Sequence, residues 1–110
     1  MSDQRGRTIT SLMEEVYANA QDKGFWDAER NPAESIALMH SELSEALEAL
    51  RRGNPPSDKI PGFSGVEEEL ADVVIRILDW CGGQKLDLEG ALLAKMKFNA
   101  GRPHKHGKAF

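Results

Sequence analysis

The sequence predicts an all-α protein in which four helices pack together as one domain over residues 1–110. In four segments, apolar residues recur at intervals of three or four positions, which is the period of an amphipathic helix. Segments rich in glycine and proline separate them, and nowhere does the chain alternate apolar and polar residues as a strand would. A chain of 110 residues suits a single domain with a modest core, to which association with other subunits would add stability.

Start and stop signals divide the chain into these helical segments. The expected helices cover about residues 9–23, 32–52, 66–80 and 88–99. Residues 53–65 contain three prolines and three glycines, so we expect a loop between the second and third helices. The two ends, residues 1–7 and 103–110, are expected to be flexible.

The residues that flank the helical segments are those that commonly begin and end helices. The expected N-caps are Thr8 or Thr10, Asn31 followed by Pro32, and Asp87. The expected terminators are Gly24, Gly53 and the pair Gly82-Gly83.

Composition and charge exclude several classes of function. The formal net charge of -4 argues against a nucleic-acid binder that uses a basic surface. Cys81 is the only cysteine, which excludes an intrachain disulfide and a cysteine-based zinc cluster. No apolar run approaches the ~20 residues that span a bilayer, and the N-terminus lacks the apolar core of a signal peptide. We therefore expect a cytoplasmic protein with neither nucleic-acid nor membrane partners.

Two pairs of acidic residues stand at the same spacing on the second and third helices. Glu42 and Glu45 form one pair, and Glu69 and Asp72 form the other. Residues three apart on a helix lie side by side, so each pair presents two carboxylates in one direction. Four such charges at the edge of a core repel one another unless a cation neutralises them, and hard divalent ions prefer oxygen ligands. Either pair alone is most simply a solvated helix face, but the two together favour a metal site.

The same helices carry more apolar surface than one interface needs. The main apolar stripe of the second helix consists of Ile36, Met39, Leu43, Ala46, Leu47 and Leu50. Leu38 and Ala49 lie outside that stripe, and Ile75 lies far from the corresponding stripe of the third helix. A lone monomer would expose too much of this surface, so we expect self-association to a dimer or a dimer of dimers.

The apolar face of the fourth helix turns basic toward its end. Beyond Leu88 and Leu92, this face continues as Lys95, Asn99 and Arg102. The tail adds His104, Lys105, His106 and Lys108. This segment is either a solvated basic end that complements the helix dipole or a set of contacts for a polyanion. The acidic pairs elsewhere in the chain favour the polyanion.

Three further side chains each have two interpretations. Trp26 either plugs the core near a helix pair or lines a pocket where its flat ring can stack. His40 lies on the apolar stripe, where a core residue and a substrate contact are equally plausible. Arg76 is expected to pair with Asp72 four residues earlier, with a phosphate contact as the alternative.

These motifs resemble those of the MazG-like all-α nucleoside triphosphate pyrophosphohydrolases. The resemblance rests on SELSE at 41–45, EEELAD at 67–72 and the ending KMKFNAGRPHKHGKAF, and it covers about residues 24–110. The family often begins the first motif with two adjacent glutamates, whereas Ser41 precedes Glu42 here. The family's ligand positions map to Glu42, Glu45, Glu69 and Asp72, so this departure leaves them intact.

The resemblance implies Mg²⁺-dependent hydrolysis between the α and β phosphates of a (d)NTP, giving (d)NMP and pyrophosphate, with Mn²⁺ as a substitute ion. It also implies a four-helix MazG-like bundle that assembles as dimers or tetramers, with sites near the subunit contacts. Hydrolysis of a phosphoanhydride needs charge neutralisation and an aligned water more than covalent help from the protein.

Roles for the remaining candidate residues follow from that chemistry. Glu45 would accept the proton of the attacking water. The triphosphate would be held by Lys95, Arg102 and Lys108 and oriented by Asn99. His40 and Trp26, or Trp80 in place of Trp26, would contact the base or sugar.

Other hypotheses stay open beside this one. The chain could be a non-enzymatic helical interaction or regulatory module whose acidic residues only decorate its surface. A related pyrophosphohydrolase acting on a phosphoribosyl nucleotide is a further alternative. A di-iron bundle is disfavoured, because such bundles use Glu-x-x-His pairs and no histidine here lies three residues after a glutamate.

Overall fold

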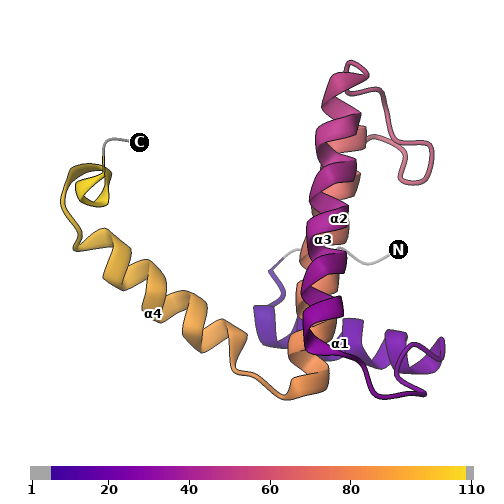
Figure 1. Ribbon diagram of the computed structural model, residues 1–110, viewed down its shortest axis with the longest axis horizontal. Coiled ribbons are helices and arrows are strands. Elements are labelled where there is room, and N and C mark those ends of the chain that lie inside the picture. The colour runs from indigo at the N-terminus through magenta and orange to yellow at the C-terminus, as the bar shows by residue number, and fades with distance from the viewer. Residues whose placement is uncertain (1–5, 109–110) are drawn as a thin grey trace.

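The computed structural model describes residues 6–108, and the regular structure within this range is entirely helical (Figure 1). The elements are α1 (Ile9–Asp22), α2 (Pro32–Arg51), α3 (Gly65–Gln84), α4 (Leu88–Ala100) and a short 3₁₀ helix, η1 (His104–Gly107). The predicted all-α class is confirmed, and the expected bounds of α1, α2 and α4 hold within one residue. Within the described range, no helix combines the length and apolarity needed to cross a membrane.

The expected flexible ends fall only partly within the described range. Residues 1–5 and 109–110 lie outside it. Helix α4 ends at Ala100 and does not continue into the tail, where residues 104–107 form the single turn η1.

Polar side chains cap the start of each α-helix. The caps are Thr8 for α1, Asn31 for α2, Ser64 for α3 and Asp87 for α4. Ser64 forms a full capping box, because Glu67 also accepts a hydrogen bond from the Ser64 backbone N–H. Each cap satisfies an otherwise unpaired backbone N–H and stabilises its helix by about 1 kcal/mol. Thr8, rather than Thr10, is the cap of α1.

The predicted end of the third helix was wrong. Gly82 and Gly83 lie inside α3, which continues to Gln84 and ends with Lys85 in the left-handed region at φ 58°. A Cβ atom at Gly83 would lie 2.2 Å from Cη2 of Trp26, and one at Gly82 would lie 2.8 Å from Cβ of Tyr17. These glycines therefore mark a close approach of other side chains to the helix rather than its end.

The core lies where α1 crosses α3. Its centre consists of Met13, Leu78 and Cys81. The partly buried residues packed around them are Ile9, Leu12, Val16, Ile77, Trp80 and Leu88. No large side chain within the described range is fully buried, so this core is small for the length of the chain.

The pair formed by α2 and α3 is antiparallel and close. Its buried residues on α2 are small: Ser35, Ala46 and Ala49. Ala49 packs against the start of α3, where a Cβ added to Gly65 would lie 3.4 Å from the Ala49 Cβ. The loop between the helices returns the chain to this point, with the Gly65 N–H donating to the Pro55 carbonyl at 2.8 Å.

The apolar stripe predicted for the second helix is largely uncovered in the single chain. Ala46 is buried and Met39 partly buried. The exposed members, with 43% to 54% of their surface accessible, are Ile36, Leu43, Leu47 and Leu50. These four residues are called the α2 stripe below. The α2 stripe is uncovered because small residues, not leucines, make the contact with α3.

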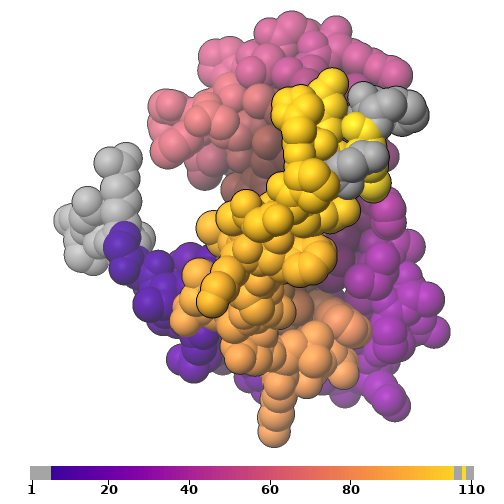
Figure 2. Space-filling view, turned by 90° about the vertical axis from the view of Figure 1, so that its left-hand side faces the viewer, coloured from indigo at the N-terminus to yellow at the C-terminus, as the bar shows by residue number. Residues whose placement is uncertain are grey.

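Helix α4 leaves the other three helices instead of covering them (Figure 1). Its first turn is attached to α1, since the Thr10 N–H donates to Glu89 Oε1 at 3.0 Å. Beyond that turn it projects as a ridge toward the viewer of Figure 2, and its large apolar residues are exposed. These are Leu92, Leu93, Met96 and Phe98.

We predict that Gly83→Ala destabilises the protein although alanine favours helix. The added methyl group meets three ring atoms of Trp26 at 2.2 to 2.8 Å. Overpacking of this kind costs about 1–3 kcal/mol, which exceeds the gain of up to about 1 kcal/mol in helix propensity. The free energy of unfolding in urea measures the effect. Gly101→Ala is the control, because its nearest neighbour would lie at an ordinary 3.7 Å; equal stability of the two variants would contradict the close approach of Trp26.

Candidate metal centre

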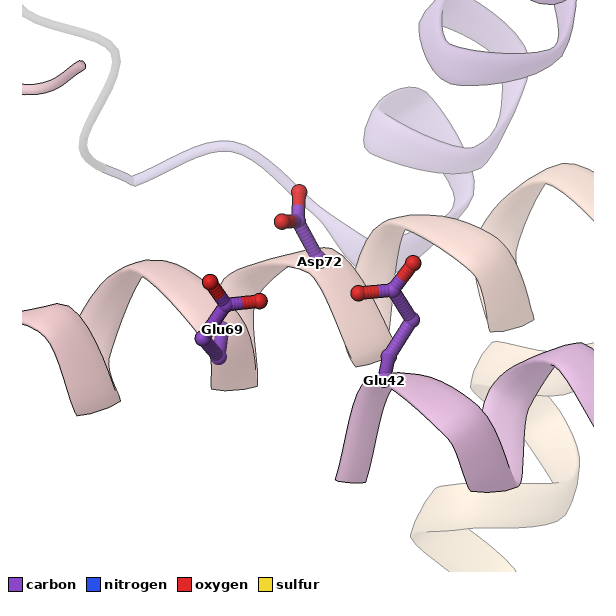
Figure 3. A group of neighbouring side chains, drawn as sticks. All are labelled: Glu42, Glu69 and Asp72. Carbon is purple, nitrogen blue, oxygen red and sulfur yellow. The ribbon is translucent and has the colours of Figure 1, made fainter. Parts of the chain in front are cut away.

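Three carboxylates from two helices meet on one side of the α2–α3 pair (Figure 3). Glu42 comes from α2, and Glu69 and Asp72 come from α3. One ligand oxygen of each lies within 4.8 Å of the others, and all three side chains are partly buried. The antiparallel contact of α2 and α3 produces this cluster, because it sets the middle of α2 beside the first half of α3. We call the three residues the carboxylate centre.

Glu45, the fourth predicted ligand, lies outside the carboxylate centre. It is exposed on α2, and three residues place it about 60° around the helix from Glu42. It remains close enough for its charge to help raise the pKa of Glu69. Glu45 is therefore a neighbour of the centre with an uncommitted carboxylate.

The carboxylate centre is electrostatically unfavourable by itself. Burial raises the pKa of Glu69, and the charges of Glu68 and Asp72 raise it further. Burial likewise raises the pKa of Asp72, with Glu42 and Glu68 adding to the effect and Lys59 and Arg76 opposing it. Burial and neighbouring negative charges thus raise the pKa values of two of the three oxygen donors, and a hard divalent cation would neutralise such a group. The residues present thus fit Mg²⁺.

Arg76 binds Glu42 and not Asp72, so the predicted partner was wrong. Its Nε donates to Glu42 Oε1 at 2.8 Å, across the α2–α3 interface. Asp72 lies one turn away on the same helix and senses Arg76 only through its charge, which lowers the Asp72 pKa. The prediction failed because helix periodicity identifies neighbours within a helix but not the partner across an interface.

A cavity of about 600 Å³ opens beside the carboxylate centre. Glu42 and Asp72 line it, together with Arg30, Arg76 and Phe25. The other lining residues are Glu15, Val16, Asn19, Ala20, Ile75 and Asp79. This volume lies within the range of pockets that hold small organic ligands. The cavity therefore joins carboxylates, cations and an apolar wall in one space.

Trp26 is fixed beside this cavity rather than lining it. Its Nε1–H donates to Asp79 Oδ1 at 2.7 Å, and its ring meets that of Tyr17 edge-on with centroids 5.4 Å apart. Arg30 donates to the other Asp79 oxygen at 2.7 Å and lies over the indole, 4.2 Å from the ring centroid. Trp26 thus packs as the plug that was one of its two interpretations.

Sequence reasoning missed Arg30, Asp79 and the role of Phe25. Asp79 is buried at the centre of the contacts with Trp26 and Arg30. The sequence shows only that Asp79 falls on the third predicted helix and Trp26 in the connection before the second. Without the fold, nothing in the sequence places these two residues together. His40 is exposed, so its interpretation as a core residue was wrong. It does not line the cavity and lies about 200° around α2 from Glu42; its contact with a substrate stays a prediction.

The basic residues predicted to bind the triphosphate gather on α4 and after it. Lys95 Nζ lies 4.6 Å and Arg102 Cζ 5.5 Å from the ring centroid of Phe98. Asn99 Oδ1 is buried there and, within the described range, accepts no hydrogen bond. Lys108 follows η1 and is exposed. None of these residues lines the cavity, because α4 leads away from α2 and α3 (Figure 1).

Comparisons with protein-family models, curated proteins and solved structures give no match for this chain. What can be inferred about its function therefore rests on the site itself.

The raised pKa values predict a pH-dependent stability difference. A carboxyl group whose pKa is raised in the folded protein contributes stability below its ordinary pKa, 3.8 for Asp72, and loses it as the pH rises through the raised value. Without metal, Asp72→Asn should therefore gain stability relative to the parent between pH 4 and pH 7, as followed by urea unfolding in EDTA. The control is Glu48→Gln, an exposed carboxylate of α2. A stability difference that stays constant with pH would contradict the raised pKa of Asp72.

Proposed function

We propose that the protein is a Mg²⁺-dependent nucleoside triphosphate pyrophosphohydrolase of the MazG-like kind, which cleaves a (d)NTP to (d)NMP and pyrophosphate. The observation that carries this proposal is the carboxylate centre at the edge of a cavity that is also lined by two arginines. Carboxylates suit the metal, and guanidinium groups suit phosphate oxygens. The alternative, a non-enzymatic interaction module with acidic residues on its surface, does not explain why carboxylates and arginines line the same cavity.

The residues divide the chemistry among them. Glu42, Glu69 and Asp72 would hold Mg²⁺, which when bound neutralises phosphate charge and lowers the pKa of a coordinated water. Glu45 lies beside the centre and is not one of its three carboxylates. Its carboxylate would therefore stay free of the metal and could accept the proton of the attacking water. The apolar side of the cavity, with Phe25, Val16 and Ile75, gives a base or sugar a surface to pack against. In this proposal Trp26 supports the cavity wall through Arg30 and Asp79.

We also propose that the working form is a dimer or tetramer. The chain exposes 8490 Å², whereas a compact monomer of 12.2 kDa exposes about 6,100 Å². Its radius of gyration is 16.3 Å, against about 13 Å for a compact chain of this length. The excess of about 2,400 Å² per copy is of the size that obligate subunit interfaces bury. The α2 stripe and the apolar residues of α4 are the surfaces available for it.

Assembly would also complete the site. The α4 cluster of Lys95, Asn99 and Arg102 is remote from the carboxylate centre of its own chain, and its Asn99 oxygen lacks a partner within the described range. A second copy whose α4 packs on the α2 stripe would bring these basic residues near the first copy's carboxylate centre. Triphosphate contacts by Lys95, Arg102 and Lys108 are proposed to arise in this way.

The first test of the function is Mg²⁺-dependent hydrolysis. We expect the parent to release pyrophosphate and a nucleoside monophosphate from at least one (d)NTP, and Mg²⁺ alone to raise its melting temperature. Glu69→Gln and Asp72→Asn should lower kcat/KM by about 100-fold or more and abolish stabilisation by Mg²⁺. Glu45→Gln should lower kcat while keeping that stabilisation. Glu48→Gln, the exposed carboxylate of α2, is the control.

The two parts of this proposal can fail separately. Stabilisation by Mg²⁺ without hydrolysis of any nucleotide would reject the enzyme and keep the metal centre. Absence of stabilisation by Mg²⁺ would reject the metal centre itself.

The test of assembly uses the exposed leucines. We expect light scattering at micromolar concentration to give the mass of a dimer or tetramer. Leu47→Lys should give a monomer with unchanged helix content, because this side chain is 52% exposed in the single chain and its loss leaves the fold intact. Ala37→Lys, also exposed on α2 but turned away from the α2 stripe, is the control. A monomeric parent would contradict the proposed assembly.

A further inference from the structure

Arg76, which lines the cavity beside the carboxylate centre, has hydrogen-bond donors to spare. Arg76 uses Nε to bind Glu42 Oε1 at 2.8 Å. Within the described range Glu42 is its only hydrogen-bond partner, so the terminal nitrogens are unused. The side chain is 38% exposed and lines the cavity. A guanidinium carries five N–H donors in a planar fork, so most of its binding capacity is left after the contact with Glu42.

The other cations near the centre are less suited to bind a ligand there. Arg30 also lines the cavity, but it is held by Asp79 at 2.7 Å and lies over the Trp26 ring. Lys59 is 76% exposed, lies 3.7 Å from Glu68 Oε2, and does not line the cavity. Of these three, only Arg76 both lines the cavity and contacts a residue of the carboxylate centre.

We propose that Arg76 binds an anionic oxygen of the diphosphate part of the substrate, and that Glu42 orients it for this role through Nε. The identification of the anion rests on the proposed function. The same guanidinium group thus contacts a carboxylate of the centre with one edge and the ligand with the other. The planar guanidinium group of arginine can donate two parallel hydrogen bonds to a phosphate, and lysine reproduces this geometry poorly.

This position gives Arg76 opposite effects on the two ligands. Its positive charge beside Glu42 opposes a divalent cation in the carboxylate centre and favours an anion in the cavity. Removing the charge should therefore strengthen binding of Mg²⁺ and weaken binding of diphosphate. A merely structural arginine, which only holds Glu42 in place, would on removal weaken both.

The experiment measures two affinities without turnover, by calorimetry on the full chain. One titration uses Mg²⁺ alone, and the other uses inorganic pyrophosphate in EDTA. For Arg76→Gln we expect about threefold to tenfold tighter Mg²⁺ binding and at least about tenfold weaker pyrophosphate binding. Arg76→Lys keeps the charge, so Mg²⁺ affinity should stay near that of the parent while pyrophosphate affinity falls to an intermediate value.

Arg52→Gln makes the same change in net charge at an exposed residue outside the cavity, and should leave both affinities unchanged. Unchanged pyrophosphate affinity in Arg76→Gln, or a parallel loss of both affinities, would overturn the proposal. If Arg76→Gln does not fold, Arg76→Lys decides alone, and parental pyrophosphate affinity in that variant would overturn it. Opposite shifts in the two affinities, found in a protein that hydrolyses no nucleotide, would support the role of Arg76 and reject the pyrophosphohydrolase function.

Discussion

The close antiparallel contact of α2 with α3 is the constraint on which the other features depend. The residues that α2 buries are small, namely Ser35, Ala46 and Ala49, and Ala49 lies against the start of α3. Small side chains let two helix backbones approach. The approach brings Glu42 within reach of Glu69, Asp72 and Arg76. It also turns the large residues of α2 away from α3, which is why the α2 stripe is exposed. The packing of α2 against α3 is thus associated both with the carboxylate centre and with an exposed apolar stripe on α2.

The carboxylate centre does not stabilise the fold of the isolated chain. Burial and mutual repulsion raise the pKa values of Glu69 and Asp72, and the single ion pair from Arg76 reaches only Glu42. Even that pair is part-exposed, so its contribution is at most about 1 kcal/mol. Clusters of groups that destabilise the fold in this way are typical of sites that bind or react. The stabilising polar contacts lie elsewhere, in the helix caps and in the buried Asp79 with Trp26 and Arg30.

Much of the fold could be predicted from the sequence because its signals are local. Helix period, caps such as Asn31 and Asp87, and the proline-rich loop depend on neighbours in the chain. Gly82 and Gly83 were misread because their function, room for Tyr17 and Trp26, is tertiary. For the site, spacing correctly grouped Glu69 with Asp72 on one face, and Glu42 joined them as expected. The displacement of Glu45, the partner of Arg76 and the involvement of Asp79 depend on how helices cross, which a periodic pattern does not encode.

The separation of acidic and basic residues within one chain bears on how such a site would work. A triphosphate carries several negative charges, and the carboxylate centre carries more. One metal ion and the two arginines of the cavity would neutralise only part of the repulsion between them. Two further cations, Lys95 and Arg102, lie around Phe98 on α4, and neither lines the cavity. The same α4 exposes apolar residues that need cover, as does the α2 stripe. Burial of apolar surface between copies and delivery of cations to the carboxylate centre would then be a single event. If the proposed function and assembly hold, affinity for a nucleotide would accordingly depend on protein concentration under conditions where the assembly dissociates.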